Sequence, residues 1–122
     1  MHIIKVKTTM LQSDLKHLNS QDEHDKFITE NENAVVVCGR NGPMCLPVYG
    51  AMKEFEPKFT NVAFSDFEFD HPEAKVIRSL PEVRNFRGLP FTIYYQKGKV
   101  VKATSSIQSA KEVKIILKEY YS

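Results

Sequence analysis

The fold of this chain is decided by one stretch, which reads Ala34-Val35-Val36-Val37-Cys38-Gly39-Arg40-Asn41-Gly42-Pro43-Met44-Cys45. Its first five residues are apolar and mostly β-branched, which is typical of a strand buried on both faces of a sheet. The next five include two glycines and a proline, and they predict a tight turn. A helix is expected from Met44 onwards, because apolar residues then recur at helical spacing: Val48, Met52, Phe55 and Phe59. The stretch therefore predicts a buried strand that turns directly into a helix.

Helix and strand signals alternate along the rest of the chain. Residues 15–18 are a short strand candidate, and a Ser-x-x-Glu capping box at 20–23 opens a helix. Pro57 predicts a kink near the end of the helix that follows Met44. The C-terminal half then contains an alternating strand at 62–69, a helix at 70–80, a hairpin at 91–103 and a last helix opened by a second capping box at 109–112.

This order of elements, β-α-β-α-β-α-β-β-α, predicts the fold class. Alternating strands and helices imply parallel strands with crossover helices, and the late hairpin adds an antiparallel edge. We therefore expect an α/β fold with a mixed central sheet. Residues 1–13 precede the first strand and are expected to form an N-terminal arm or an extra strand. Residues 14–122 are expected to form the domain.

The composition narrows the class of protein. The 122 residues suffice for one domain, and 17 basic against 15 acidic residues leave a net charge of +2. No strong basic field is available for nucleic acid, and the longest apolar run, 34–38, is too short to span a bilayer. The N-terminus lacks the pattern of a secretory signal, and two cysteines cannot build a disulfide scaffold. We therefore expect a cytoplasmic protein that binds neither nucleic acid nor membranes.

The element order and three sequence anchors resemble the thioredoxin family, from about Leu15 to Tyr121. One anchor is the stretch from Pro90 through Lys97-Gly98 to Ser109, which is similar to the family without a gap. Arg87-Gly88-Leu89-Pro90 is similar to the family's Arg-Gly-Ile-Pro, whose proline is cis and faces the redox motif. The spacing after Cys45 suits the second motif cysteine and the long helix that follows it. The resemblance implies a thioredoxin-like three-layer α/β/α sandwich.

The redox motif itself departs from the family. Its Trp-Cys-Gly-Pro-Cys corresponds here to Asn41-Gly42-Pro43-Met44-Cys45. Cys45 falls on the resolving position, and Gly42 falls where the attacking thiol should be. Glycine has no side chain, so the resemblance implies a degenerate motif without the usual dithiol cycle. The family's buried acid is matched by Val36, and a glycine before the last helix by Ser106.

Cys38 offers a second thiol. It lies two residues after Val36, so both side chains point to the same face of the strand. The resemblance implies that this face looks toward the motif helix. A Cys38–Cys45 disulfide is one alternative, provided that the two Cα atoms come within about 7 Å. The other is that both sulfurs pack in the core as small apolar groups.

The resemblance also implies a groove that binds extended peptides beside the cis proline. The expected groove residues are Gly42, Pro43, Met44, Leu89, Pro90 and Phe91.

The histidines are scattered, none has metal-ligand spacing, and a solvated surface position is expected for each. Residues 66–70 alternate acids and aromatics, which indicates a half-exposed strand rather than a cation site. We expect no metal and no cofactor.

Three hypotheses on function follow. The first is a thioredoxin-like protein in thiol redox or partner binding that is not a standard dithiol-disulfide reductase. The second is an atypical thiol-disulfide oxidoreductase that uses Cys45 alone or the Cys38/Cys45 pair. The third is a structural or assembly scaffold without redox chemistry. The expected partner is a protein, and thiol-containing proteins are among the candidates.

Overall fold

The apolar stretch forms β2 (Asn33–Gly39), the central strand of the sheet. The protein is described by a computed structural model, which covers residues 11–122. The five apolar residues of β2 are all 0% exposed. The strand pairs in parallel with β3 (Ala63–Glu68) and antiparallel with β4 (Phe91–Gln96). The prediction of a strand buried on both faces is confirmed.

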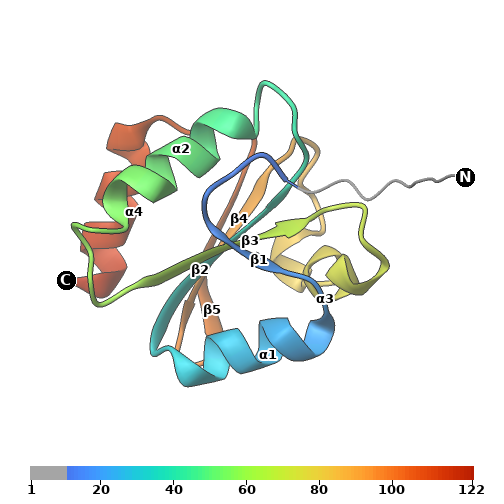
Figure 1. The fold of residues 1–122 in the computed structure, drawn as a ribbon, viewed down its shortest axis with the longest axis horizontal. Helices are drawn as coiled ribbons and strands as arrows, with labels where there is room; N and C mark the ends of the chain where they lie inside the picture. The colour runs from blue at the N-terminus through green and yellow to red at the C-terminus, as the bar shows by residue number, and fades with distance from the viewer. Residues whose placement is uncertain (1–10) are drawn as a thin grey trace, which may run out of the picture.

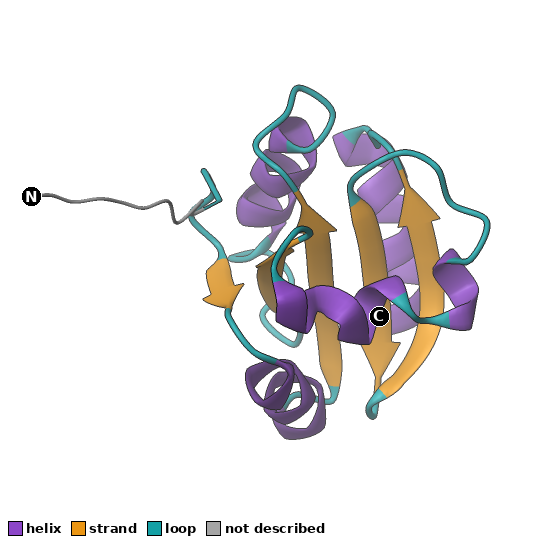
Figure 2. Cartoon of the chain, turned by 90° about the vertical axis from the view of Figure 1, so that its right-hand side faces the viewer, coloured by secondary structure: helices purple, strands orange, loops and turns teal. Residues whose placement is uncertain are grey.

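Two strands form the edges of the sheet. β1 (Lys16–Leu18) pairs in parallel with β3, and β5 (Lys99–Ser105) pairs antiparallel with β4. The resulting order is β1-β3-β2-β4-β5, and Figure 2 shows the strands side by side with short β1 at the margin. The predicted mixed sheet, parallel with an antiparallel hairpin, is therefore confirmed.

Helices cover both faces of this sheet. In Figure 1, α2 (Leu46–Phe55) and α4 (Ala110–Tyr121) lie over one face, while α1 (Gln21–Glu30) and α3 (Lys75–Arg78) lie over the other. The three layers form the expected α/β/α sandwich. No helix among residues 11–122 has the length and apolar character needed to cross a membrane.

Both predicted capping boxes stand at helix starts. Ser20 accepts a hydrogen bond from the backbone N–H of Glu23 at 3.0 Å, which caps α1. At the start of α4, Ser109 and Glu112 satisfy each other's backbone N–H groups, at 3.1 and 2.8 Å. A cap of this kind stabilises a helix by about 1 kcal/mol. These local signals explain why the first residues of both helices could be predicted.

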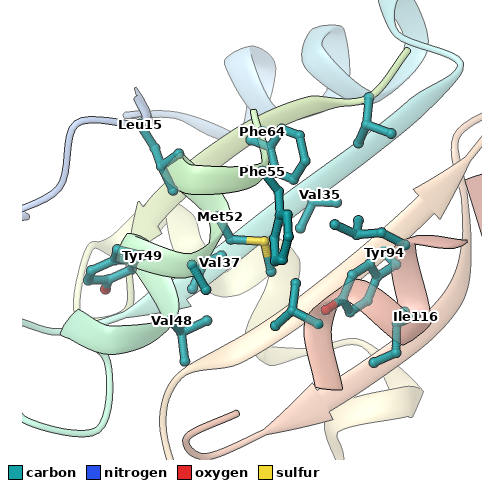
Figure 3. Close-up of a cluster of buried hydrophobic side chains, with 14 of the residues drawn as sticks. Leu15, Val35, Val37, Val48, Tyr49, Met52, Phe55, Phe64, Tyr94 and Ile116 are labelled. Atoms are coloured by element: carbon teal, nitrogen blue, oxygen red, sulfur yellow. The ribbon is translucent and has the colours of Figure 1, made fainter. Parts of the chain in front are cut away.

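Two apolar clusters fill the spaces between the layers. The first, here called the α2-side cluster, is drawn in Figure 3 and includes Leu15, Val35, Val37, Cys45, Val48, Tyr49, Met52, Phe55, Phe64 and Tyr94. The second, the α1-side cluster, includes Leu18, Phe27, Val36, Cys38, Phe67, Ile77, Phe91 and Ile93. Neighbouring residues of β2 thus alternate between the clusters, as a pleated strand requires.

Two helices differ from their predicted form. α2 ends at Phe55, before Pro57, so the expected kink is wrong. The expected helix at 70–80 is a 3-10 turn at Pro72–Ala74 followed by the single turn of α3, and a second 3-10 turn at Pro81–Val83 lies just beyond it. The residue that caps the first of these turns is His71 rather than Asp70, because His71 Nδ1 accepts a hydrogen bond from the backbone N–H of Glu73. Each 3-10 turn begins with a proline, which has no N–H to continue a preceding helix.

The segment before β1 packs against the domain. Leu11 and Leu15 are buried in the α2-side cluster. The backbone N–H of Gln12 donates to Asn41 Oδ1 at 2.6 Å, so this segment contacts the loop that precedes α2. Residues 1–10 of the expected arm lie outside the described residues.

Candidate functional site

The thiol of Cys45 lies at the N-terminus of α2, beneath a tight loop. Cys45 is the N-cap residue of α2 and is only 2% exposed. Its Sγ accepts a hydrogen bond from the backbone N–H of Arg40 at 3.4 Å. The N–H groups of Cys45 and Leu46 both donate to the carbonyl of Gly42, at 3.0 and 3.1 Å. The loop is therefore held closed over the sulfur.

Gly39 allows four groups to meet at the end of β2. A Cβ atom at this position would lie 2.7 Å from Tyr49 Oη, 2.9 Å from Cys45 Sγ and 2.9 Å from Pro90 Cβ. A Cβ atom does not approach unbonded atoms this closely in a packed core, so the arrangement requires glycine. The helix α2, the strand β2 and the segment that contains Pro90 therefore meet at Gly39.

Tyr49 connects this point to the interior of the α2-side cluster. Its side chain is buried beside Val37 and Val48, as Figure 3 shows. Its hydroxyl donates to the carbonyl oxygen of Arg40 at 2.9 Å. Burial raises the pKa of Tyr49, and the nearby Cys45 adds to the effect. The tyrosine is therefore a neutral donor that fixes the loop from below.

The segment before β4 presents a free backbone edge next to this point. The Leu89–Pro90 peptide bond is cis, and Pro90 is buried. The carbonyls of Gly88 and Pro90 both accept from Ser106 N–H, at 3.2 and 3.0 Å. Neither backbone group of Leu89 has a hydrogen-bond partner within residues 11–122. This edge is available to another chain.

Ser106 occupies a position that suits glycine. Its φ angle is +68°, in the left-handed region that non-glycine residues rarely adopt. Its side chain also lies against Gly88, where an added Cβ would come within 3.1 Å of Ser106 Cβ. Serine is therefore held in this strained conformation directly beside the free edge at Leu89.

The loop position at Gly42, three residues before Cys45, is open. A Cβ atom on Gly42 would meet nothing within 4 Å, and the residue is half-buried. Pro43 is exposed, and Met44 is 43% exposed, which makes it one of the most exposed large apolar residues of the described chain. We call Gly42, Pro43 and Met44 the loop rim. It presents an apolar surface and no thiol.

Cys38 does not lie on the expected face. It belongs to the α1-side cluster with Val36, whereas Cys45 belongs to the α2-side cluster, so the expectation that Cys38 faces the motif helix is wrong. Both cysteines are free thiols. Burial raises the pKa of Cys38 to about 12, which makes it a poor nucleophile at neutral pH. The sequence could not reveal this, because in a strand apolar on both faces the pattern does not say which residues face which helix.

Phe91 does not line the predicted groove with its side chain. It is 7% exposed, and its ring contacts those of Phe69 and Phe86 at centroid distances of 5.5 and 5.6 Å. These contacts belong to the α1-side cluster. Strand alternation after Pro90 turns this side chain away from α2, so among the expected groove residues Phe91 is a core residue.

A buried acid, missed in the sequence, lies on the α2 face of the sheet. Asp66 is 1% exposed and pairs in register with Val37, a member of the α2-side cluster. Its carboxylate lies 2.8 Å from His17 Nδ1 and accepts a hydrogen bond from Ser13. Burial raises the pKa of Asp66, while the bonds to Ser13 and His17 oppose this rise. The prediction of a half-exposed strand is wrong for this residue.

Two histidines are also less exposed than expected. His24 is 2% exposed, with Nε2 2.8 Å from the hydroxyl of Tyr95 and Nδ1 2.9 Å from Asp25. His17 is partly buried against Asp66. The expected solvated position is therefore wrong for His24 and only partly right for His17. Among residues 11–122, no three potential ligands gather to hold a metal ion.

Comparison with known proteins identifies the fold. No protein-family model matches the sequence, and neither does any curated protein. Solved structures do match. A thioredoxin from Plasmodium falciparum has a TM-score of 0.73 and 22% identity, with 87% of this chain and 99% of that chain covered.

Two other thioredoxins extend this likeness to distant organisms. A thioredoxin variant from Halobacterium salinarum has a TM-score of 0.74 and 16% identity, covering 94% of this chain and 97% of that one. Mitochondrial thioredoxin 3 of Saccharomyces cerevisiae has a TM-score of 0.71 and 13% identity, with 86% and 94% covered. Because identities this low establish architecture only, the conclusion concerns the backbone: this chain has the thioredoxin fold.

Proposed function

We propose that this protein is a thioredoxin-fold domain that binds a protein partner at the loop rim and the Leu89 edge, without dithiol exchange. One observation carries the proposal. The outer motif position, Gly42, has no thiol, and the remaining motif sulfur, on Cys45, is only 2% exposed. A thiol attack on a substrate disulfide needs an accessible sulfur.

The binding geometry follows from the same elements. An extended segment of the partner adds to the free N–H and C=O of Leu89 as a further strand, which supplies two backbone hydrogen bonds. Its side chains then contact the exposed Pro43 and Met44. Both thiols are free, which suits a reducing compartment, and a cytoplasmic location is part of the proposal.

A selection of random twelve-residue peptides on the immobilised protein tests the binding function. Met44→Asp places a charge on the loop rim, while Ile115→Asp makes the same change at another exposed apolar residue, on α4 (56% exposed). Selected peptides are expected to bind the wild type and Ile115→Asp equally, and Met44→Asp at least tenfold more weakly. Equal binding to all three proteins, or no enrichment of any sequence, contradicts the proposal.

Insulin reduction by dithiothreitol tests the absence of dithiol exchange. The wild type is expected not to accelerate it. Gly42→Cys places a thiol in open space and restores a Cys-x-x-Cys pair with Cys45. This pair passes two electrons and two protons to an insulin disulfide and becomes a disulfide, which dithiothreitol reduces again. Gly50→Cys, at an equally open position within α2, is the matched control and is expected to stay inactive.

A second candidate function is one-cysteine chemistry at Cys45. It rests on geometry: Cys45 Sγ lies at the N-terminus of α2 and accepts a hydrogen bond from the backbone N–H of Arg40. Labelling with a maleimide separates the two candidates. Under the main proposal both thiols react slowly in the folded protein. A single fast-reacting thiol that is lost in Cys45→Ser, together with wild-type insulin reduction, would favour the second candidate instead.

A further inference from the structure

The arginines of the loop before α2 and of the segment before Leu89 are unevenly paired. Arg40 is engaged, because its guanidinium binds Asp70 through two hydrogen bonds of 2.7 and 2.8 Å and lies over the ring of Phe69. In contrast, Arg84 and Arg87 are exposed and have no ion pair or hydrogen bond to the side chain within residues 11–122. Two positive charges are therefore unmatched in the segment that leads to Leu89.

The acidic groups at this end of the sheet are largely engaged. Asp70 is bound by Arg40, and this ion pair lowers the pKa of Asp70. Glu68 accepts a hydrogen bond from the backbone N–H of Asp70 at 2.8 Å. Between residues 78 and 90 the chain has three arginines and a single acid, Glu82. The surface beside the free edge is therefore positive.

Arg87 is close enough to the edge to contact a bound peptide. It precedes Leu89 by two residues, which corresponds to about 7 Å along an extended chain. An added strand lies about 5 Å from the strand that it joins. The arginine side chain can span this distance and meet a side chain of the neighbouring strand.

We propose that the Leu89 edge binds an extended peptide segment rich in acidic residues, one of whose carboxylates pairs with Arg87. This inference rests on the proposed function and adds the chemistry of the partner. Arginine matches carboxylates with two parallel hydrogen bonds, so the pairing selects carboxylates over other polar groups. Because the arginines are exposed, the interaction weakens as salt rises.

Fluorescence anisotropy with three labelled twelve-residue peptides tests the inference. The peptides alternate Thr with Glu, Thr with Gln, or Thr with Lys. The Glu peptide is expected to bind at least tenfold more tightly than the Gln peptide at 50 mM NaCl, and this advantage is expected to shrink at 300 mM. The Lys peptide is expected not to bind. A copy of the Glu peptide N-methylated at alternate residues cannot pair with a backbone edge and is expected to lose binding.

Two charge reversals complete the design. Arg87→Glu is expected to weaken binding of the Glu peptide at least tenfold, whereas Lys118→Glu, the same charge change in the last turn of α4, is expected to leave it unchanged. If the Glu and Gln peptides bind equally and Arg87→Glu does not change the affinity, the preference for an acidic partner is overturned. Loss of binding on N-methylation would then still support peptide binding at the Leu89 edge. Insensitivity to N-methylation overturns the edge itself. Stronger binding of a twelve-nucleotide oligothymidine than of the Glu peptide overturns the choice of a peptide partner.

Discussion

Gly39→Ala is the substitution that tests the close packing of α2, β2 and the Pro90 segment at the candidate site. The added methyl group would lie 2.7 Å from Tyr49 Oη, and 2.9 Å from both Cys45 Sγ and Pro90 Cβ. The tyrosine hydroxyl is held by its bond to Arg40, and the proline ring is part of the backbone. None of these three neighbours can move without disturbing another element. The backbone at Gly39 must therefore shift.

The expected cost follows from two opposing effects. Inserting a methyl group into a packed core costs about 1–3 kcal/mol. Replacing glycine by alanine also restricts the unfolded chain, which returns about 0.4–1 kcal/mol. The free energy of unfolding should therefore fall by roughly 1–2 kcal/mol, and Tm by roughly 4–8 °C for a domain of this size.

Thermal and urea unfolding followed by circular dichroism measures this cost. The matched control is Gly50→Ala, where the new methyl group meets nothing within 4 Å in the middle of α2. This control should gain about 0.5–1 kcal/mol, because alanine is the better helix former. A second readout is the rate of maleimide labelling at Cys45, which should rise in Gly39→Ala as the sulfur is displaced.

A Gly39→Ala protein as stable as the wild type, with an unchanged labelling rate at Cys45, would contradict this expectation. That result would mean that the space between the strand, the helix and the cis-proline segment at Gly39 accommodates a methyl group. The close contact could not then be what holds Cys45 beneath the loop.

Three further predictions concern single residues near the site. Burial raises the pKa of Asp66 in the folded state, so the wild type loses stability as pH rises through this raised pKa. Asp66→Asn does not titrate, so its free energy of unfolding relative to that of the wild type should increase from pH 4 to pH 8. A constant difference would contradict this. Ser106→Gly should stabilise by roughly 0.5–1 kcal/mol in urea unfolding, since relief of the left-handed conformation outweighs the entropy of glycine. Tyr49→Phe should lower the free energy of unfolding by about 0.5–1.5 kcal/mol, because the carbonyl of Arg40 loses its donor, and a variant as stable as the wild type would show that water replaces the hydroxyl at no cost.

Local signals were sufficient for most of the fold. The run of β-branched residues in β2, the capping boxes of α1 and α4, and the turn of the β4–β5 hairpin each specify their element through neighbouring residues. In the hairpin, Lys97 and Gly98 both adopt positive φ angles, of 53° and 78°, as a tight two-residue turn requires. The helix at 70–80 was overestimated, since its first turn is 3-10 and its α-helical part ends at Arg78, where the extended Leu80 precedes Pro81.

The candidate site was predicted only in part. The loop that carries Gly42 and Cys45 and the start of α2 could be placed from the sequence, because they lie within one continuous stretch. The burial of the Cys45 sulfur, its hydrogen bond from Arg40 and the closeness of Pro90 to Gly39 could not. Pro90 is far from Gly39 in sequence, and only the packing of β4 beside β2 brings them together.

The residues alone determined the order of strands and helices, because propensity, capping and turn chemistry act over a few neighbouring positions. Only the tertiary structure decided that Cys38 and Cys45 face opposite layers, and that Asp66 is buried against His17, 49 positions away. The physical reason is strand register. The pattern of a strand shows which side chains share a face, but the helix that covers that face is set by how distant strands align.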